Sequence, residues 1–148
     1  MATIAEAQAQ IVENFSLLGA WDEKYAYLIE LGEEMPEMDP ALKTEENLVK
    51  GCQSSVWFHM QNEGGLLYLE ADSDSMIVKG IAALLVQVVS GHHPQEILAM
   101  DMKFLDEIGM WRHLSSQRNN GLMAMLKHIR EYAQESGGNE LKDKLRHG

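Results

Sequence analysis

The only cysteine of this 148-residue chain, Cys52, lies in a segment that favours chemistry at its thiol. Gly51 before it permits unusual backbone angles and leaves space beside the sulfur. The polar run 53–55 that follows is typical of a loop, and Lys50 brings a positive charge that would favour thiolate over thiol. A lone cysteine is more often an inert, buried side chain, so it is this combination that predicts a redox or transfer thiol.

A second candidate, Arg118, opens the last predicted helix, in the sequence SSQRNNGL of residues 115–122. A positive charge at a helix N-terminus opposes the helix dipole, so this position is locally unfavourable. Two interpretations stay open from the residues alone. Arg118 is either an exposed side chain satisfied elsewhere, or it is directed at an anion such as a thiolate, a persulfide or a partner carboxylate.

The six histidines form no motif typical of a metal site. The chain has no His-Glu-x-x-His sequence and no group of cysteines and histidines, so we expect no metal ion. A Walker loop and a Gly-x-Gly-x-x-Gly motif are also missing, and nucleotide binding has no support. His59 projects from a predicted strand and either assists Cys52 or lies at a sheet edge. A cysteine–histidine hydrolase stays open, because the members of such triads lie far apart in sequence.

Composition sets the class of protein. The length suits a single domain, and the net charge of -11 argues against a nucleic-acid partner. Residues 1–46 hold 11 acids and two bases, which is -9 of that charge; this is either a solvated surface or a face that steers a basic partner. The first residues lack a secretory signal, and the most apolar window, 76–89, is too short to span a bilayer. We expect a cytoplasmic protein without membrane contact, in which Cys52 stays a free or catalytic thiol.

Hydrophobic periodicity predicts the elements that position Cys52 and Arg118. Helical spacing covers residues 4–18, 21–32, 73–90, a helix begun by Pro94 that carries residues through 108, and a last helix that ends at 136–138. Alternation predicts strands at 55–60 and 66–71 around a turn at 62–65, with a shorter third strand at 47–50. We therefore expect one α+β domain over residues 1–138, with a small three-stranded antiparallel sheet packed on helices, and a disordered tail at 139–148.

Four segments of the chain carry a resemblance when taken together: WDEKYAYLIELG at 21–32, NLVKGCQSSVW at 47–57, DSDSMIVKG at 72–80 and RNNGL at 118–122. In this order along the chain, they resemble the SufE family of sulfur acceptors. The departures from the family pattern are local: Ala71 replaces an expected Gly, Ser116 an expected Pro and Asn119 an expected Ser.

The resemblance implies a two-layer fold related to the NifU/IscU scaffold and a role in sulfur transfer. Cys52 would accept persulfide sulfur from a cysteine desulfurase, stimulate that enzyme, and deliver the sulfur to an iron–sulfur scaffold complex. Pyridoxal phosphate belongs to the desulfurase, and no cofactor is expected on this chain, which would act as an accessory protein in a monomer or homodimer. Arg118 is carried over as a site residue, with Gly51, Gln53, Ser54 and Asp74 as supporting or partner-binding residues.

The competing interpretations are a cysteine-dependent hydrolase or thiol redox sensor, and a non-catalytic module whose acidic N-terminal helices bind a basic partner. The NifU-like scaffold role itself is disfavoured, because a cluster site needs several cysteines and this chain has one.

Overall fold

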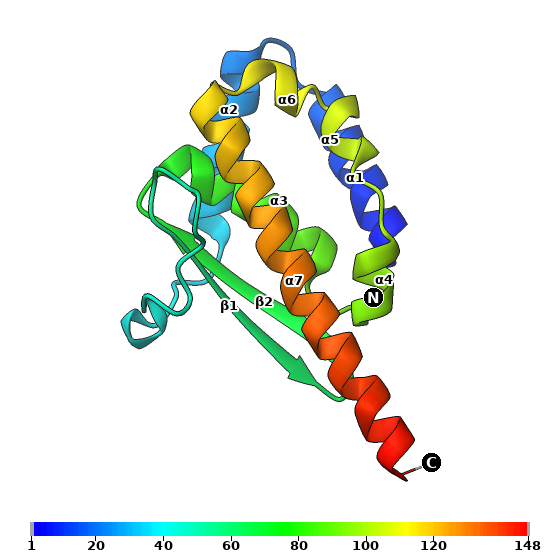
Figure 1. The fold of residues 1–148 in the computed structure, drawn as a ribbon. Helices are drawn as coiled ribbons and strands as arrows, with labels where there is room; N and C mark the ends of the chain where they lie inside the picture. The colour runs from blue at the N-terminus through cyan, green and yellow to red at the C-terminus, as the bar shows by residue number, and fades with distance from the viewer. Residues whose placement is uncertain (1, 148) are drawn as a thin grey trace.

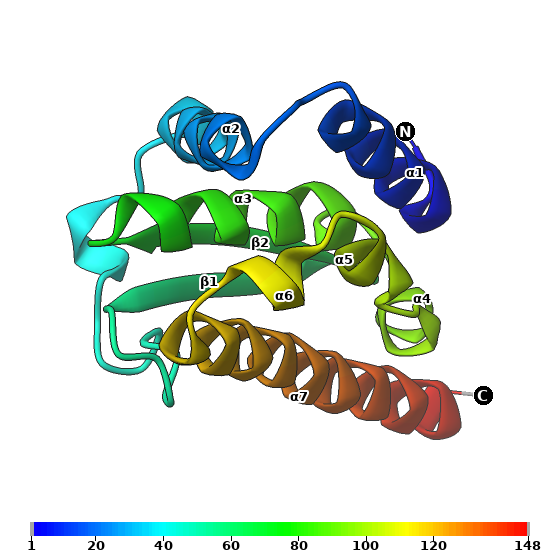
Figure 2. The same ribbon diagram turned by 90° about the horizontal axis from the view of Figure 1, so that it is seen from above.

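The computed structural model describes the backbone of residues 2–147 and the side chains of residues 2–137. The two N-terminal helices predicted by periodicity are α1 (Ile4–Ser16) and α2 (Trp21–Glu34). Thr3 and Glu6 form a capping box at the start of α1, which satisfies backbone amides that the helix leaves unpaired. The two helices form one layer against the central helix α3 (Figures 1 and 2).

The central helix α3 (Met76–Val89) is apolar on nearly all sides and is the centre of the core. Its N-cap is Ser75, whose hydroxyl accepts from the Val78 amide at 3.4 Å. It contacts α1, α2, the sheet and the last helix, so it is buried from several directions. Seen from above, α3 lies between the α1–α2 pair and α7 (Ser116–His147) (Figure 2).

The α2–α3 crossing is close because glycines meet there. A β-carbon built on Gly80 would lie 2.1 Å from the carbonyl oxygen of Leu28, and one built on Gly32 would lie 3.0 Å from the Gly80 amide nitrogen. No side chain fits at Gly80 without separating the two backbones. This crossing therefore depends on the absence of a side chain.

The sheet has two antiparallel strands, β1 (Val56–Glu63) and β2 (Leu66–Ser73), in register from Val56↔Ser73 to Glu63↔Leu66. Gly64 and Gly65 make the turn with φ of 61° and 86°, angles that glycine adopts without a steric penalty. Side chains alternate along each strand between the core and the outer face. The predicted hairpin is confirmed.

The predicted third strand at residues 47–50 is wrong in extent. This segment makes one isolated bridge, Leu48↔Trp57, through bonds from the Val49 amide to the Val56 carbonyl and from the Phe58 amide to the Asn47 carbonyl, each 2.8 Å. Turns on both sides of the segment stop the ladder: the Asn47 amide bonds to the Thr44 carbonyl, and Gly51 has φ of 95°. The sheet therefore has two strands within the described residues.

Two further expectations for the helices need correction. The single helix expected from Pro94 is two short ones, α4 (Pro94–Ala99) and α5 (Lys103–Glu107), because the chain turns extended at Met100. The sequence predicted that the last helix ends at residues 136–138. The helix α7 instead continues past Gly137-Gly138 to His147. A glycine inside a helix costs only about 1 kcal/mol relative to alanine, which a long helix tolerates.

The remaining elements are the short 3-10 helix η1 (Pro40–Leu42) before the Cys52 segment and α6 (Met110–His113) before α7. The His113 ring stacks on Trp21 with centroids 4.2 Å apart, which holds α6 against the start of α2. Among the described residues, every helix is too short or too polar to cross a bilayer.

Candidate functional site

Cys52 lies in a pocket of about 240 Å³, where the loop 50–55 meets the first turns of α3 and α7. The structure brings together four of the residues predicted for the site, Cys52, Gln53, Ser54 and Arg118, although Arg118 is 66 residues further along the chain. Sequence reasoning missed the other residues of the lining, which are Ser75, Val78, Ser115, Gln117, Gly121 and Met125. Helix-capping patterns point to Ser75 and Ser115, but Gly121 carries no signal of its own.

The thiol of Cys52 is half-buried and faces α7. Its Sγ donates to the carbonyl oxygen of Gly121 at 3.5 Å, and a β-carbon on Gly121 would lie 3.7 Å from the sulfur. Burial raises the pKa of the Cys52 thiol above its ordinary value. The expectation that Lys50 favours the thiolate is therefore not supported in this conformation: Lys50 is exposed, and burial decides the direction.

The backbone conformation of Gly51 sets the path of the loop 50–55. Its φ of 95° lies in the region that favours glycine, and a β-carbon there would also come within 3.3 Å of the Ala124 β-carbon. Gly51 thus turns the chain from Lys50 into the pocket.

Asp74 is outside the pocket lining and holds the end of the loop instead. Its Oδ1 accepts from the Ser55 amide at 3.1 Å, while its own amide donates to the Ser55 carbonyl at 3.2 Å. The Ser73 hydroxyl donates to that same carbonyl at 2.8 Å. These bonds fix residue 55, where the loop enters β1.

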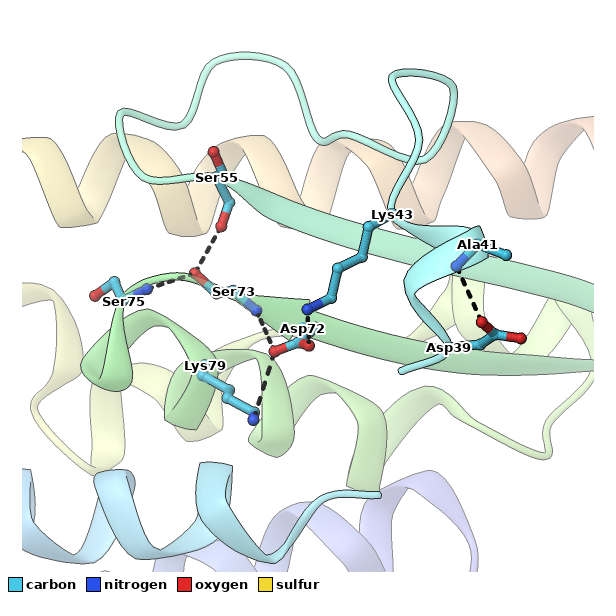
Figure 3. A network of polar contacts seen from close by, with 8 residues as sticks. All are labelled: Asp39, Ala41, Lys43, Ser55, Asp72, Ser73, Ser75 and Lys79. Carbon is cyan, nitrogen blue, oxygen red and sulfur yellow. Dashed lines mark hydrogen bonds and ion pairs between the residues drawn. The ribbon is translucent and has the colours of Figure 1, made fainter. Parts of the chain in front are cut away.

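A buried carboxylate, Asp72, ties three segments together beside the loop (Figure 3). It pairs with Lys43 at 2.9 Å and with Lys79 of α3 at 3.4 Å, and its Oδ1 accepts from the Ser73 amide at 2.8 Å. Burial acts to raise its pKa, but the Lys43 and Ser73 hydrogen bonds and the two lysine charges hold the pKa below its ordinary value. Its contribution to stability is present at neutral pH and is lost as pH falls from the ordinary aspartate pKa through the lowered one.

Arg118 lies in the first turn of α7 with an exposed side chain on the pocket rim. Its amide donates to the Ser115 hydroxyl at 3.3 Å, so Ser115 caps α7. Among the described residues, no carboxylate forms an ion pair with its guanidinium. The guanidinium is therefore available to an anion that enters the pocket.

The pocket lining contains no histidine in the part of the chain that the structure describes. His59 lines a separate groove together with His128, whose ring meets Phe58 edge-on. Among the described residues, the pocket thus combines Cys52 with an arginine and the first turns of two helices, and its lining offers no imidazole base for a hydrolase.

Comparison with known proteins decides the family. Residues 9–133 match the SufE model, described as an Fe-S metabolism associated domain. The chain belongs to the SufE family. A SufE-like protein of Rhizobium meliloti is 40% identical over 130 residues, covering 84% of this chain and 93% of that one. Another, from Rhizobium etli, is 41% identical over 129 residues, covering 84% and 87%; both are named as uncharacterized.

The fold of this SufE-family chain also matches a solved structure. The solution structure of a hypothetical protein from Thermus thermophilus aligns with a TM-score of 0.72 at 24% identity, covering 88% of this chain and 95% of that one. This likeness concerns the fold alone. The family resemblance of the four sequence segments is confirmed.

The departures from the SufE pattern near Arg118 leave an ordered helix start. Ser116 begins α7 directly after the capping Ser115, and the Asn119 side chain donates to the Trp111 carbonyl of α6 at 2.9 Å. The Asn119 Oδ1 is buried without a partner among the described residues. Asn119 thus links α7 to α6 and leaves one buried acceptor without a partner among the described residues.

The raised pKa of the SufE-family thiol predicts its reactivity. We expect the rate of Cys52 alkylation by iodoacetamide to rise with pH around a midpoint above that of a free cysteine peptide, because the reactive thiolate is disfavoured by burial. The measurement is the alkylation rate against pH for the native protein and for the protein in denaturant. A native midpoint at or below the denatured one would contradict the burial argument.

Proposed function

We propose that the protein is a sulfur acceptor that takes persulfide sulfur onto Cys52 from a pyridoxal-phosphate-dependent cysteine desulfurase and delivers it for iron–sulfur cluster assembly. The observation that carries the proposal is the position of Cys52, the one cysteine of a SufE-family chain, in a pocket rimmed by Arg118. The description of the family as associated with Fe-S metabolism supports the destination of the sulfur.

The transfer step conserves electrons without an added oxidant. The Cys52 thiol loses its proton, and the thiolate attacks the outer sulfur of the donor's persulfide. A bond forms between Cys52 Sγ and that sulfur, the donor's sulfur–sulfur bond breaks, and the donor leaves as a thiolate. The product is a persulfide on Cys52, whose negative charge Arg118 and the first turn of α7 stabilise.

The pocket also accounts for protection between transfers. A half-buried thiol with a raised pKa is mostly protonated, and oxidation proceeds through the thiolate. In the proposal, a docked desulfurase draws the loop outward, which removes the burial that raises the pKa. The same shelter argues against a redox sensor, because such cysteines have low pKa values and are exposed.

The proposal includes a cytoplasmic location, since an accessible thiol carrier needs a compartment that keeps cysteines reduced. It also places pyridoxal phosphate on the desulfurase and gives this chain no cofactor. The downstream partner is an iron–sulfur scaffold complex.

The direct test is mass spectrometry of the intact protein after incubation with a cysteine desulfurase and free cysteine. We expect a mass increase of one sulfur atom that dithiothreitol removes and that maps to the peptide containing Cys52. A protein that gains no sulfur while the desulfurase turns over would exclude the acceptor role.

Arg118 gives a second prediction. Arg118→Ala should slow sulfur transfer to Cys52 by about tenfold, the size of one charge-assisted hydrogen bond, with little change in melting temperature. Arg118→Lys should recover part of the rate. Lys127→Ala is the matched control, because Lys127 is an exposed cation of α7 outside the pocket. Equal rates for wild type and Arg118→Ala would remove Arg118 from the mechanism.

A further inference from the structure

The outer edge of β1 is only partly paired. Backbone groups of alternate residues point to this edge, and the 47–49 segment uses the Val56 carbonyl and the Phe58 amide. By the same alternation, the amide and carbonyl of Met60 and Asn62 point outward, beyond the end of the bridge. Among the described residues, these groups have no backbone partner. An open strand edge of this kind is a template for a further strand.

A groove of about 580 Å³ follows this edge. On β1 the groove is lined by Phe58, His59 and Met60, and Asn62 lies beyond its lining along the same strand. One wall is the chain around η1, including Glu46, and the other is the face of α7 that carries Tyr132 and Glu135. A strand rises about 3.3 Å per residue, so the groove has room for several residues of extended chain.

The charges of the groove indicate what would occupy it. Among the residues whose side chains the structure describes, its formally charged ones are Glu46 on one wall and Glu135 on the other, and neither forms an ion pair with another of these residues. Burial lowers the pKa of His128, so that ring stays neutral near pH 7. Because successive side chains of a strand point to opposite faces, an inserted segment would direct neighbouring side chains to the two walls. Basic side chains at adjacent positions would meet both acids.

The groove faces the same way as the Cys52 pocket. Gly121 and Met125 of the pocket and His128, Tyr132 and Glu135 of the groove follow one stripe of α7 at spacings of three and four residues. In the described chain, no set of three histidine, cysteine or acidic side chains lies close enough to hold a metal ion. The groove therefore suits a polypeptide ligand, and the described residues give no evidence for a bound metal ion.

We infer that the β1 edge groove binds an extended, basic segment of a partner protein, which adds to the sheet as a third strand beside Met60 and Asn62. The sheet edge supplies backbone hydrogen bonds, and Glu46 and Glu135 select for the basic side chains. A partner anchored in this way lies on the face of α7 from which Cys52 is reached.

The probe is the synthetic peptide acetyl-Thr-Val-Lys-Arg-Val-Thr-amide, titrated into the isotope-labelled full chain and followed by amide NMR. We expect the largest shift changes at the Met60 and Asn62 amides, and slower hydrogen exchange at both. Two further peptides carry N-methyl groups at alternate residues, one on the odd and one on the even positions. In an added strand, only one of these two sets of amides points at β1. One methylated peptide should therefore bind at least about fivefold more weakly than the unmethylated peptide, which corresponds to the loss of one backbone hydrogen bond, and the other should not.

Variants separate edge pairing from charge attraction. Asn62→Pro removes the outward amide and should weaken binding relative to Asn62→Ala; both lose the Asn62 bond to the Gly65 amide, so the difference reports the backbone. Glu135→Gln should weaken binding about threefold, and Glu13→Gln on α1 should not. Equal binding of both N-methylated peptides, or no change at Met60 and Asn62 at millimolar peptide, would overturn the inference. Concentration-dependent changes at these amides without peptide would instead assign the edge to a second copy.

Discussion

Cys52→Ser is expected to abolish sulfur acceptance, with no added sulfur by mass spectrometry and a desulfurase rate equal to that without acceptor. A serine hydroxyl stays protonated near neutral pH and forms no persulfide, so neither nucleophile nor carrier remains. The fold should persist, because the site is half-buried and a hydroxyl can donate to the Gly121 carbonyl as the thiol does.

The control for this substitution is Lys127→Ala, which changes an exposed side chain of α7 outside the pocket and leaves the sulfur in place. It should accept sulfur and stimulate the desulfurase nearly as wild type does. Added sulfur on Cys52→Ser at the wild-type level would show that the acceptor function does not reside in the thiol.

Gly80→Ala is expected to lower the free energy of unfolding by about 3 kcal/mol or more. The new β-carbon would lie 2.1 Å from the Leu28 carbonyl oxygen, and because the backbone fixes the positions of both atoms, no rotamer change relieves the contact. The helices α2 and α3 must separate, which opens the core at its centre. Alanine's higher helix propensity, about 1 kcal/mol, offsets only part of this loss.

Gly137→Ala is the matched substitution for Gly80→Ala. Its β-carbon would meet Gln95 and Pro94 at 3.7 Å, an ordinary contact, within helix α7. We therefore expect a gain of up to about 1 kcal/mol, and urea unfolding of wild type, Gly80→Ala and Gly137→Ala measures both effects. A Gly80→Ala protein as stable as wild type would show that the α2–α3 crossing has room for a methyl group.

Much of this architecture could be predicted from sequence because it rests on local signals. Periodicity located α1, α2 and α3, and alternation around Gly64-Gly65 located the hairpin. The prediction of a third strand at 47–50 was wrong because strand pairing there depends on the path of the chain after Gly51. The alternation of polar and apolar residues carries no information about that path. The predicted end of α7 was wrong because two glycines are only a statistical stop signal, and a long helix tolerates the cost of about 1 kcal/mol for a glycine in its interior.

In the candidate site, too, some features could be predicted from the sequence and others depend on the folded chain. Cys52 and Arg118 could be placed together from family segments, and they do line one pocket. The effect on the thiol could not be predicted, because Lys50 is near in sequence while burial against α7 decides the pKa. The Asp72 cluster was missed, since Lys43, Asp72 and Lys79 converge only in the folded chain.

The bond from the Val49 amide to the Val56 carbonyl has a kinetic consequence for any donor. It closes the base of the loop 50–55, and Cys52 stands three residues from Val49. Three extended residues span about 10 Å, so the sulfur can sample only a small volume around a fixed base. A sulfur donor seated beside this base would therefore meet the thiol at a high effective concentration.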